Sequence, residues 1–182
     1  MTATSPHPKR ADHRVRMRRS GVATLWLILF IPVFLIALCV VIDVGTIWMA
    51  RAELEDGLEA AAIAGVVVWE DANDPRIVPP PPGQQAAEAD ARAAAIAMAA
   101  ANSVRGEPIV IVDGDIALGE IRYAPAYEFA VINPVGVGND SAIRIIADAT
   151  VASRAIPGVN YTVQAGVIAV ARGGDFYLLP SP

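Results

Sequence analysis

A long uncharged segment near the N-terminus limits what this chain can fold into more than any other feature. The segment Val22–Ile42 has 21 residues, of which 15 are Leu, Ile, Val or Phe. A helix rises about 1.5 Å per residue, so this segment would be roughly 30 Å long, which is the thickness of the hydrocarbon core of a bilayer. We therefore predict a single transmembrane helix over residues 21–44.

A cleaved secretory signal peptide is the alternative interpretation of this segment. Signal peptides usually have an apolar region of about 7–15 residues, followed by a cleavage site of the small-x-small type. The apolar segment here is longer, and Met49-Ala50-Arg51-Ala52 matches such a site only weakly. The length therefore favours an anchor that stays in the membrane.

The charges on the two sides of the segment predict its orientation. Six of the 14 basic residues precede it, namely Lys9, Arg10, Arg14, Arg16, Arg18 and Arg19. Because positively charged flanks stay in the cytoplasm, we expect residues 1–20 to be a basic cytoplasmic arm. The chain after Val44 has eight arginines against 17 acids, a net charge of −9. We expect residues 45–172 to form an acidic domain on the other side of the membrane. Because the basic arm adjoins the membrane segment, we expect it to contact a lipid surface and not a nucleic acid.

Two helices are predicted in the first half of the chain, and the first of them includes the apolar segment. Apolar or small residues recur at helical spacing as one stripe, namely Ile47, Leu54, Leu58, Ala61, Gly65 and Val68, so one helix is expected over residues 22–69. Asp74-Pro75 and the four prolines at 79–82 break that helix and form a connector over residues 74–83. Residues 84–102 include 11 alanines among 19 residues, which predicts a second helix.

The remaining sequence is typical of strands. Short β-branched or alternating segments are expected to be strands at 109–112, 116–123, 127–132, 142–152 and 161–171, with a hairpin turn at Asp113-Gly114. Residues 173–182 are expected to be a loose tail. The predicted fold is α+β, in which a long transmembrane and amphipathic helix and an Ala-rich helix precede a small, mainly antiparallel sheet.

Few residues could carry chemistry outside the membrane. His7 and His13 both lie in the basic arm, and Cys39, the single cysteine, lies in the apolar segment. A His-based catalytic triad or zinc site in the domain is thereby excluded. Asp113 and Asp115 are the nearest pair of acids, and their position around Gly114 favours a turn. We expect no catalytic residues, no metal, no cofactor and no small-molecule substrate.

Several short pieces of the sequence occur in an order that is typical of one family. They are Arg18-Arg19-Ser20-Gly21 before the apolar segment, Pro32 within it, Asp43-Val44-Gly45 at its end, and Leu54 opening an alanine-rich continuation to Ala64-Gly65. Together, residues 18–65 resemble the N-terminal segment of TadG-like and TadE-like proteins, the pseudopilin-like components of the Tad (tight adherence, Flp pilus) assembly system. A weaker resemblance, which includes residues 93–105, extends to about residue 155.

The resemblance implies a structural or accessory pilin-like component of Tad-type pilus assembly or secretion in the cell envelope. Its implied partners are the lipid bilayer and other pilin-like or Tad assembly proteins. A prepilin-type cut would separate Gly21 from Val22. Such precursors usually carry Glu five residues after the glycine, and Trp26 at this position disfavours the cut.

Helix-to-helix contact is the mechanism that the sequence suggests for this component. Small residues permit close approach of helices, and the candidates for such packing are Asp43, Gly45, Leu54, Leu58, Ala61 and Gly65. Asp43 is interpreted as an acid at the membrane boundary, with pairing to a basic group or to a neighbour's N-terminal amine as the alternative. A membrane-tethered binding module unrelated to pili is the alternative function. An anchored enzyme that uses Asp113, Asp115 and Glu120 is a third.

Overall fold

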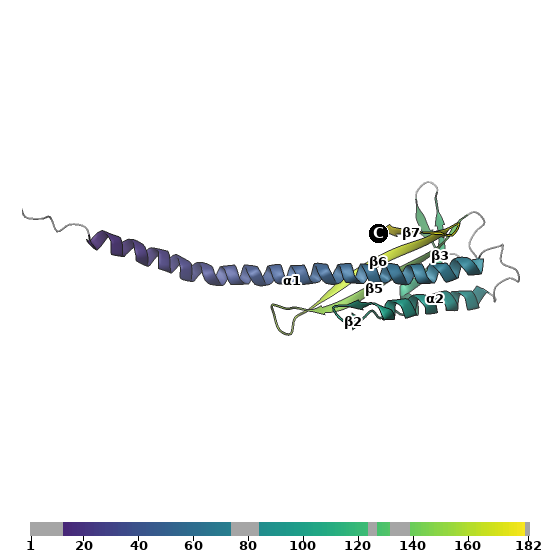
Figure 1. Ribbon diagram of the computed structural model, residues 1–182, viewed down its shortest axis with the longest axis horizontal. Helices are drawn as coiled ribbons and strands as arrows, with labels where there is room; N and C mark the ends of the chain where they lie inside the picture. Colours follow the sequence, from purple (N-terminus) through teal and green to yellow (C-terminus); the bar gives the residue numbers. More distant parts are fainter. Residues whose placement is uncertain (1–12, 74–83, 124–126, 132–138, 181–182) are drawn as a thin grey trace, which may run out of the picture.

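One helix forms the long axis of the molecule. The computed structural model describes residues 13–73, 84–123, 127–131 and 139–180. Helix α1 runs from His13 to Asn73, a length of 61 residues with Pro32 inside it. Its N-terminal half projects from the domain, and its C-terminal half lies along it (Figure 1). The expected long helix is confirmed, and it is longer than predicted because it begins within the basic arm and ends four residues later.

The second helix lies beside the first. Helix α2, Gln84–Ala101, packs against the C-terminal half of α1 (Figure 1). Every fourth residue of α2 faces the core as a buried alanine, namely Ala87, Ala91, Ala95 and Ala99. The predicted Ala-rich helix is therefore confirmed. The Pro-rich connector at 74–83 lies outside the described residues.

A five-stranded antiparallel sheet packs against α1. Its order is β4-β3-β5-β6-β7. The strands are β3 (Ile116–Arg122), β4 (Glu128–Ala130), β5 (Asp140–Ala152), β6 (Asn160–Arg172) and β7 (Asp175–Pro180). Helix α1 crosses the two long central strands, β5 and β6. The predicted antiparallel sheet is thus confirmed.

The segment before the sheet differs from the prediction. Residues 109–112 are not a strand, because the chain has already formed a small hairpin from β1 (Ser103–Val104) and β2 (Glu107–Pro108). Ile109 and Ile111 bury their side chains without strand pairing. Asp113–Asp115 is a single 3-10 turn that leads into β3, whose partners are β4 and β5. The predicted hairpin turn at Asp113-Gly114 is therefore wrong.

The expected loose tail is also wrong, because it forms the edge strand β7. Arg172 and Asp175 pair across a two-residue turn, in which Gly173 and Gly174 have φ of 62° and 92°. Glycine adopts such positive φ values without a steric penalty, which suits tight hairpins. The following apolar residues then pair with β6. The Gly-Gly pair was a hairpin signal in the sequence.

The stripe predicted on α1 forms the centre of the core. Leu54, Leu58 and Ala61 are fully buried, and Ile47 and Val68 pack at its margin. Trp69 is fully buried as well, and its indole Nε1 donates to the Gly119 carbonyl at 3.1 Å. The described part of the domain is therefore organised around the C-terminal half of α1.

Gly65 lies where three elements, α1, α2 and β5, come close together. A Cβ atom at this position would lie 2.6 Å from Ile143 Cδ1 and 3.1 Å from both the Ala91 carbonyl oxygen and Ala95 Cβ. These neighbours belong to β5 and α2. A larger residue here would have to displace the end of the Ile143 side chain and push the Ala91 carbonyl and Ala95 away by a few tenths of an ångström.

Gly65→Ala is expected to destabilise the domain, whereas Gly45→Ala is not. Overpacking costs about 1–3 kcal/mol at a close-packed site. A Cβ at Gly45 meets no atom within 4 Å, and alanine is favoured over glycine in a helix by about 0.5–1 kcal/mol. Thermal unfolding of both variants in one detergent measures the difference. Equal melting temperatures would show that the close approach at Gly65 is not needed.

Candidate functional site

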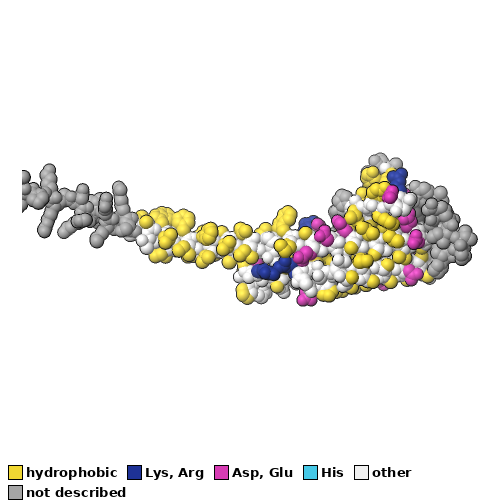
Figure 2. All heavy atoms as spheres, viewed as in Figure 1, with side chains coloured by type: hydrophobic (Ala, Val, Ile, Leu, Met, Phe, Trp, Pro, Cys, Tyr) yellow, Lys and Arg dark blue, Asp and Glu magenta, His cyan; other side chains and the backbone are white. Residues whose placement is uncertain are grey.

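The projecting half of α1 exposes a continuous apolar surface. Large apolar side chains are exposed from Val22 to Met49, and Leu25 and Phe34 reach 69% and 68% exposure. Figure 2 shows these side chains along the helix, whereas the acids gather over the domain. Among the described residues, one helix is long and apolar enough to cross a membrane, and its most apolar part is not buried. A surface of this extent needs lipid or another protein to cover it.

Asp43 lies near the C-terminal end of this surface and is buried at 5% exposure. Its carboxylate accepts hydrogen bonds from Ser153 Oγ at 2.6 Å and from Tyr161 OH at 3.0 Å. It also accepts the backbone amides of Arg154 at 3.0 Å and Ala155 at 3.1 Å. These donors belong to the loop between β5 and β6 and to the start of β6. We call this set of four hydrogen bonds the Asp43 clasp.

The Asp43 clasp adds a role that the sequence did not suggest for this acid. Among the described residues, its carboxylate accepts hydrogen bonds from hydroxyl and amide donors and not from a basic side chain. Pairing with a neighbour's N-terminal amine stays a prediction. The carboxylate joins the end of the apolar helix to residues more than a hundred positions later in the chain. Because an unpaired acid next to lipid is costly, the four donors stabilise Asp43 where it lies.

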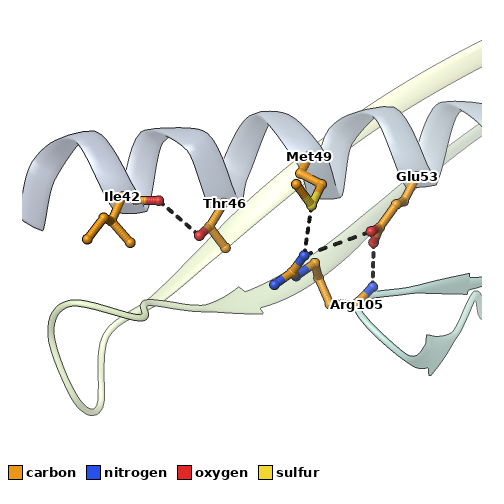
Figure 3. Close-up of polar contacts among 5 residues, drawn as sticks. All are labelled: Ile42, Thr46, Met49, Glu53 and Arg105. Atoms are coloured by element: carbon orange, nitrogen blue, oxygen red, sulfur yellow. Dashed lines mark hydrogen bonds and ion pairs between the residues drawn. The ribbon is translucent and has the colours of Figure 1, made fainter.

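A second acid of α1 holds another turn of the domain. Figure 3 shows Arg105 between Met49 and Glu53. The Arg105 amide donates to Glu53 Oε2 at 2.6 Å, and its guanidinium lies 3.9 Å from Glu53 Oε1 and 3.0 Å from Met49 Sδ. Arg105 has a φ of 55°, a left-handed conformation that is rare without glycine. Glu53 therefore stabilises the tight β1–β2 turn against α1.

Two tyrosines act as fixed donors near acids. The hydrogen bond to Asp43, together with burial, raises the pKa of Tyr161. Burial and the hydrogen bond to Asp140 raise the pKa of Tyr123 to about 12. Both phenols are therefore protonated at neutral pH and donate to these carboxylates.

The residues predicted for helix packing fall into two groups. Leu54, Leu58, Ala61 and Gly65 are buried in the core of the chain itself, so they are not available to a neighbouring subunit. Gly45 is exposed, with open space beside it. Gly21 and Val22 are exposed within the continuous helix. The sequence did not reveal that Ser153, Ala155 and Tyr161 meet Asp43, because nothing local links them to it.

The acids considered for catalysis do not gather at one place. Asp115 accepts the Val112 amide at 2.9 Å and thereby closes the 3-10 turn. Glu120 is buried on β3 and pairs with Arg122 at 3.0 Å. Glu120 comes five positions after Asp115, about 16 Å along the strand. No three His, Cys, Asp or Glu side chains of the described residues are arranged to hold a metal ion.

Asp43→Ala is expected to release the β5–β6 loop. Trypsin cuts after Arg154 in the loop and after the exposed Arg172, which serves as an internal reference. Loss of hydrogen bonds to a carboxylate should increase loop opening, and hence cleavage after Arg154 relative to Arg172, about tenfold or more. Asp43→Asn keeps one acceptor and should have a smaller effect. Mass spectrometry of timed digests in detergent gives the ratio, and an unchanged ratio would contradict the clasp.

Comparison with known proteins agrees with the resemblance seen in the sequence. Residues 21–70 match the family model described as Putative Flp pilus-assembly TadE/G-like. The match includes the exposed apolar half of α1, Asp43 and the buried stripe up to Trp69. No curated protein and no solved structure matches the chain. The matched family is one of pilus assembly and not of enzymes, and it supports a role related to pilus assembly. Over residues 21–70, this chain is therefore similar to TadE/G-like proteins of Flp pilus assembly.

Proposed function

We propose that this protein is a pilin-like accessory component of Tad-type pilus assembly or secretion, held in the bacterial inner membrane by α1. The observation that carries the proposal is the position of the TadE/G-like match. It runs across the junction between the exposed apolar helix and the packed domain. The apolar segment and the first packed element of the domain therefore belong to one continuous helix. Such a helix suits a subunit that transmits its position in the bilayer to the domain outside.

The packing surface for other pilin-like helices is the exposed part of α1. The buried stripe of the domain is already used by α2 and the sheet. The apolar side chains between Val22 and Met49 are exposed, and Gly45 offers open space for a close helix contact. The subunit would stay in lipid through this surface and exchange lipid for neighbouring helices during assembly.

The orientation follows from the flanking charges. Alkaline phosphatase is active only outside the cytoplasm, so a fusion after Pro182 should be active. Changing Arg14, Arg16, Arg18 and Arg19 to Gln removes most of the positive charge that retains the arm. This matched variant should lose much of the activity at equal protein level. An inactive wild-type fusion would contradict the proposed orientation.

Loss of the protein should change the pili. We expect deletion of the gene to reduce surface filaments and adhesion, and the full chain to restore both. Electron microscopy and an adhesion assay measure the effect. Unchanged filament number and adhesion would instead favour a membrane-tethered binding module.

A photo-reactive phenylalanine in the membrane segment tests the helix contacts directly. Placed at Phe30 or Phe34, on one exposed face of α1, it should crosslink to another pilin-like or Tad protein identified by mass spectrometry. The control position is Tyr177 on β7, which has 50% exposure but lies on the domain. Crosslinks from Tyr177 alone would place the contact in the domain and contradict packing through the membrane helix.

A further inference from the structure

The tip of the β5–β6 hairpin, Ser153–Val159, lies beside the apolar half of α1 and points back along it (Figure 1). A pocket of about 430 Å³ separates the tip from the helix, and its walls include Leu35, Cys39 and Val40 from α1 and Ala155 and Ile156 from the tip. Leu35 precedes Asp43 by eight residues, about 12 Å along the helix axis. If the span ends near Asp43, the helix wall of the pocket lies in the acyl-chain region, and the tip, which is held at Asp43, lies at the boundary with the lipid headgroups.

Most backbone N–H groups of the tip donate hydrogen bonds within the chain and do not need water. The amides of Arg154 and Ala155 donate to Asp43, and the amide of Ile156 donates to Ser153 Oγ at 2.8 Å. The Ser153 amide donates to the Val159 carbonyl at 2.8 Å, and the Val159 amide donates to the Ile156 carbonyl at 3.3 Å. Proline at 157 has no N–H. Five of the six amide N–H groups in this described segment are thus satisfied within the chain, which removes most of the cost that unpaired donors would have near lipid.

The side chains of the tip match the chemistry of a lipid surface. Ile156 is 52% exposed although it is strongly apolar, and Pro157 is exposed beside it. Arg154 is exposed on the same tip. A guanidinium forms strong hydrogen bonds with phosphate, and its long side chain can reach the headgroup from an apolar position. Figure 2 shows apolar side chains continuing from the helix onto the adjoining end of the domain.

We propose that Ser153–Val159 is a second lipid-binding element, seated in the extracytoplasmic leaflet of the membrane. A phospholipid acyl chain occupies the pocket between the tip and α1, Ile156 enters the interface, and Arg154 binds the lipid phosphate. The Asp43 clasp holds the tip at this depth, so the domain has two contacts with the membrane and a fixed tilt. The proposal depends on the membrane anchoring proposed above.

Spin labels on the full-length protein in phosphatidylethanolamine–phosphatidylglycerol liposomes test the proposal. The native Cys39 reports on the span. In a Cys39→Ser background, Ile156→Cys reports on the tip and Tyr177→Cys is the control, because the two native side chains have matched exposures of 52% and 50%. Tyr177 pairs with Val170, ten residues along β6 from Asn160, or roughly 33 Å from the hairpin tip. Power saturation then compares access by oxygen, which enters lipid, with access by a water-soluble nickel chelate.

The proposal predicts that the labels at 39 and 156 are accessible to oxygen and shielded from nickel, whereas the label at 177 is accessible to nickel. Nickel access at 156 equal to that at 177 would place the tip in water and overturn the lipid-binding element. Low access of both reagents at 156 would show a protein covering, such as a second copy of the chain, and would overturn it as well. Nickel access at 39 would overturn the anchor itself, so the two failures are distinguishable.

Arg154→Glu in the Ile156→Cys background tests the headgroup contact. Its side chain is exposed and the clasp uses only its backbone amide, so the fold should be unaffected. Charge reversal opposite a phosphate should raise nickel access at 156 severalfold, toward the value at 177. The Arg154→Lys variant should stay close to wild type. If nickel access at 156 were unchanged in the Arg154→Glu variant, Arg154 would not be part of the lipid site.

Discussion

The close contact of α1 with α2 and the central strands is the interaction on which the rest of the structure depends. Leu54, Leu58 and Ala61 fill the space over β5 and β6, and Gly65 lets the backbone of α2 approach. Every fourth residue of α2 is a buried alanine, so α2 contributes a smooth surface with little side-chain entropy to lose. Once this contact is made, the direction of the projecting half of α1 is set, because the helix is continuous.

One helix is therefore exposed along its N-terminal half and packed into the domain along its C-terminal half. The junction between the two halves is held by specific polar contacts. Up to Met49 most apolar side chains of α1 are exposed, and from Ala50 onward they include those buried in the protein core. The Asp43 clasp and the Glu53–Arg105 contact lie on either side of the turn where this change occurs. Both use a carboxylate of α1 to hold backbone amides of a distant loop. The domain is thus fastened to the part of α1 closest to the membrane.

This arrangement suits the role related to pilus assembly that the family match over residues 21–70 supports. A helix anchored in the core of its domain moves as one body with that domain. Contacts made in the bilayer can then orient surfaces outside it, and contacts outside can orient the span. The β5–β6 tip adds a point of support beside the span. For such a component the geometry of the junction matters more than any single reactive side chain.

The sequence by itself determined the apolar span, the Ala-rich helix and the antiparallel character of the sheet, because each depends on a local period or composition. It also contained Gly173-Gly174, a dipeptide that is typical of hairpin turns and that indicates the strand β7 after it. Only the tertiary structure decided that Leu54 to Gly65 face the chain's own core and that Asp43 meets Ser153 and Tyr161. The hydrogen bond from Trp69 to Gly119 joins residues 50 positions apart, and the Asp43 contacts join residues 110 or more positions apart. No sequence periodicity reports on pairs so distant.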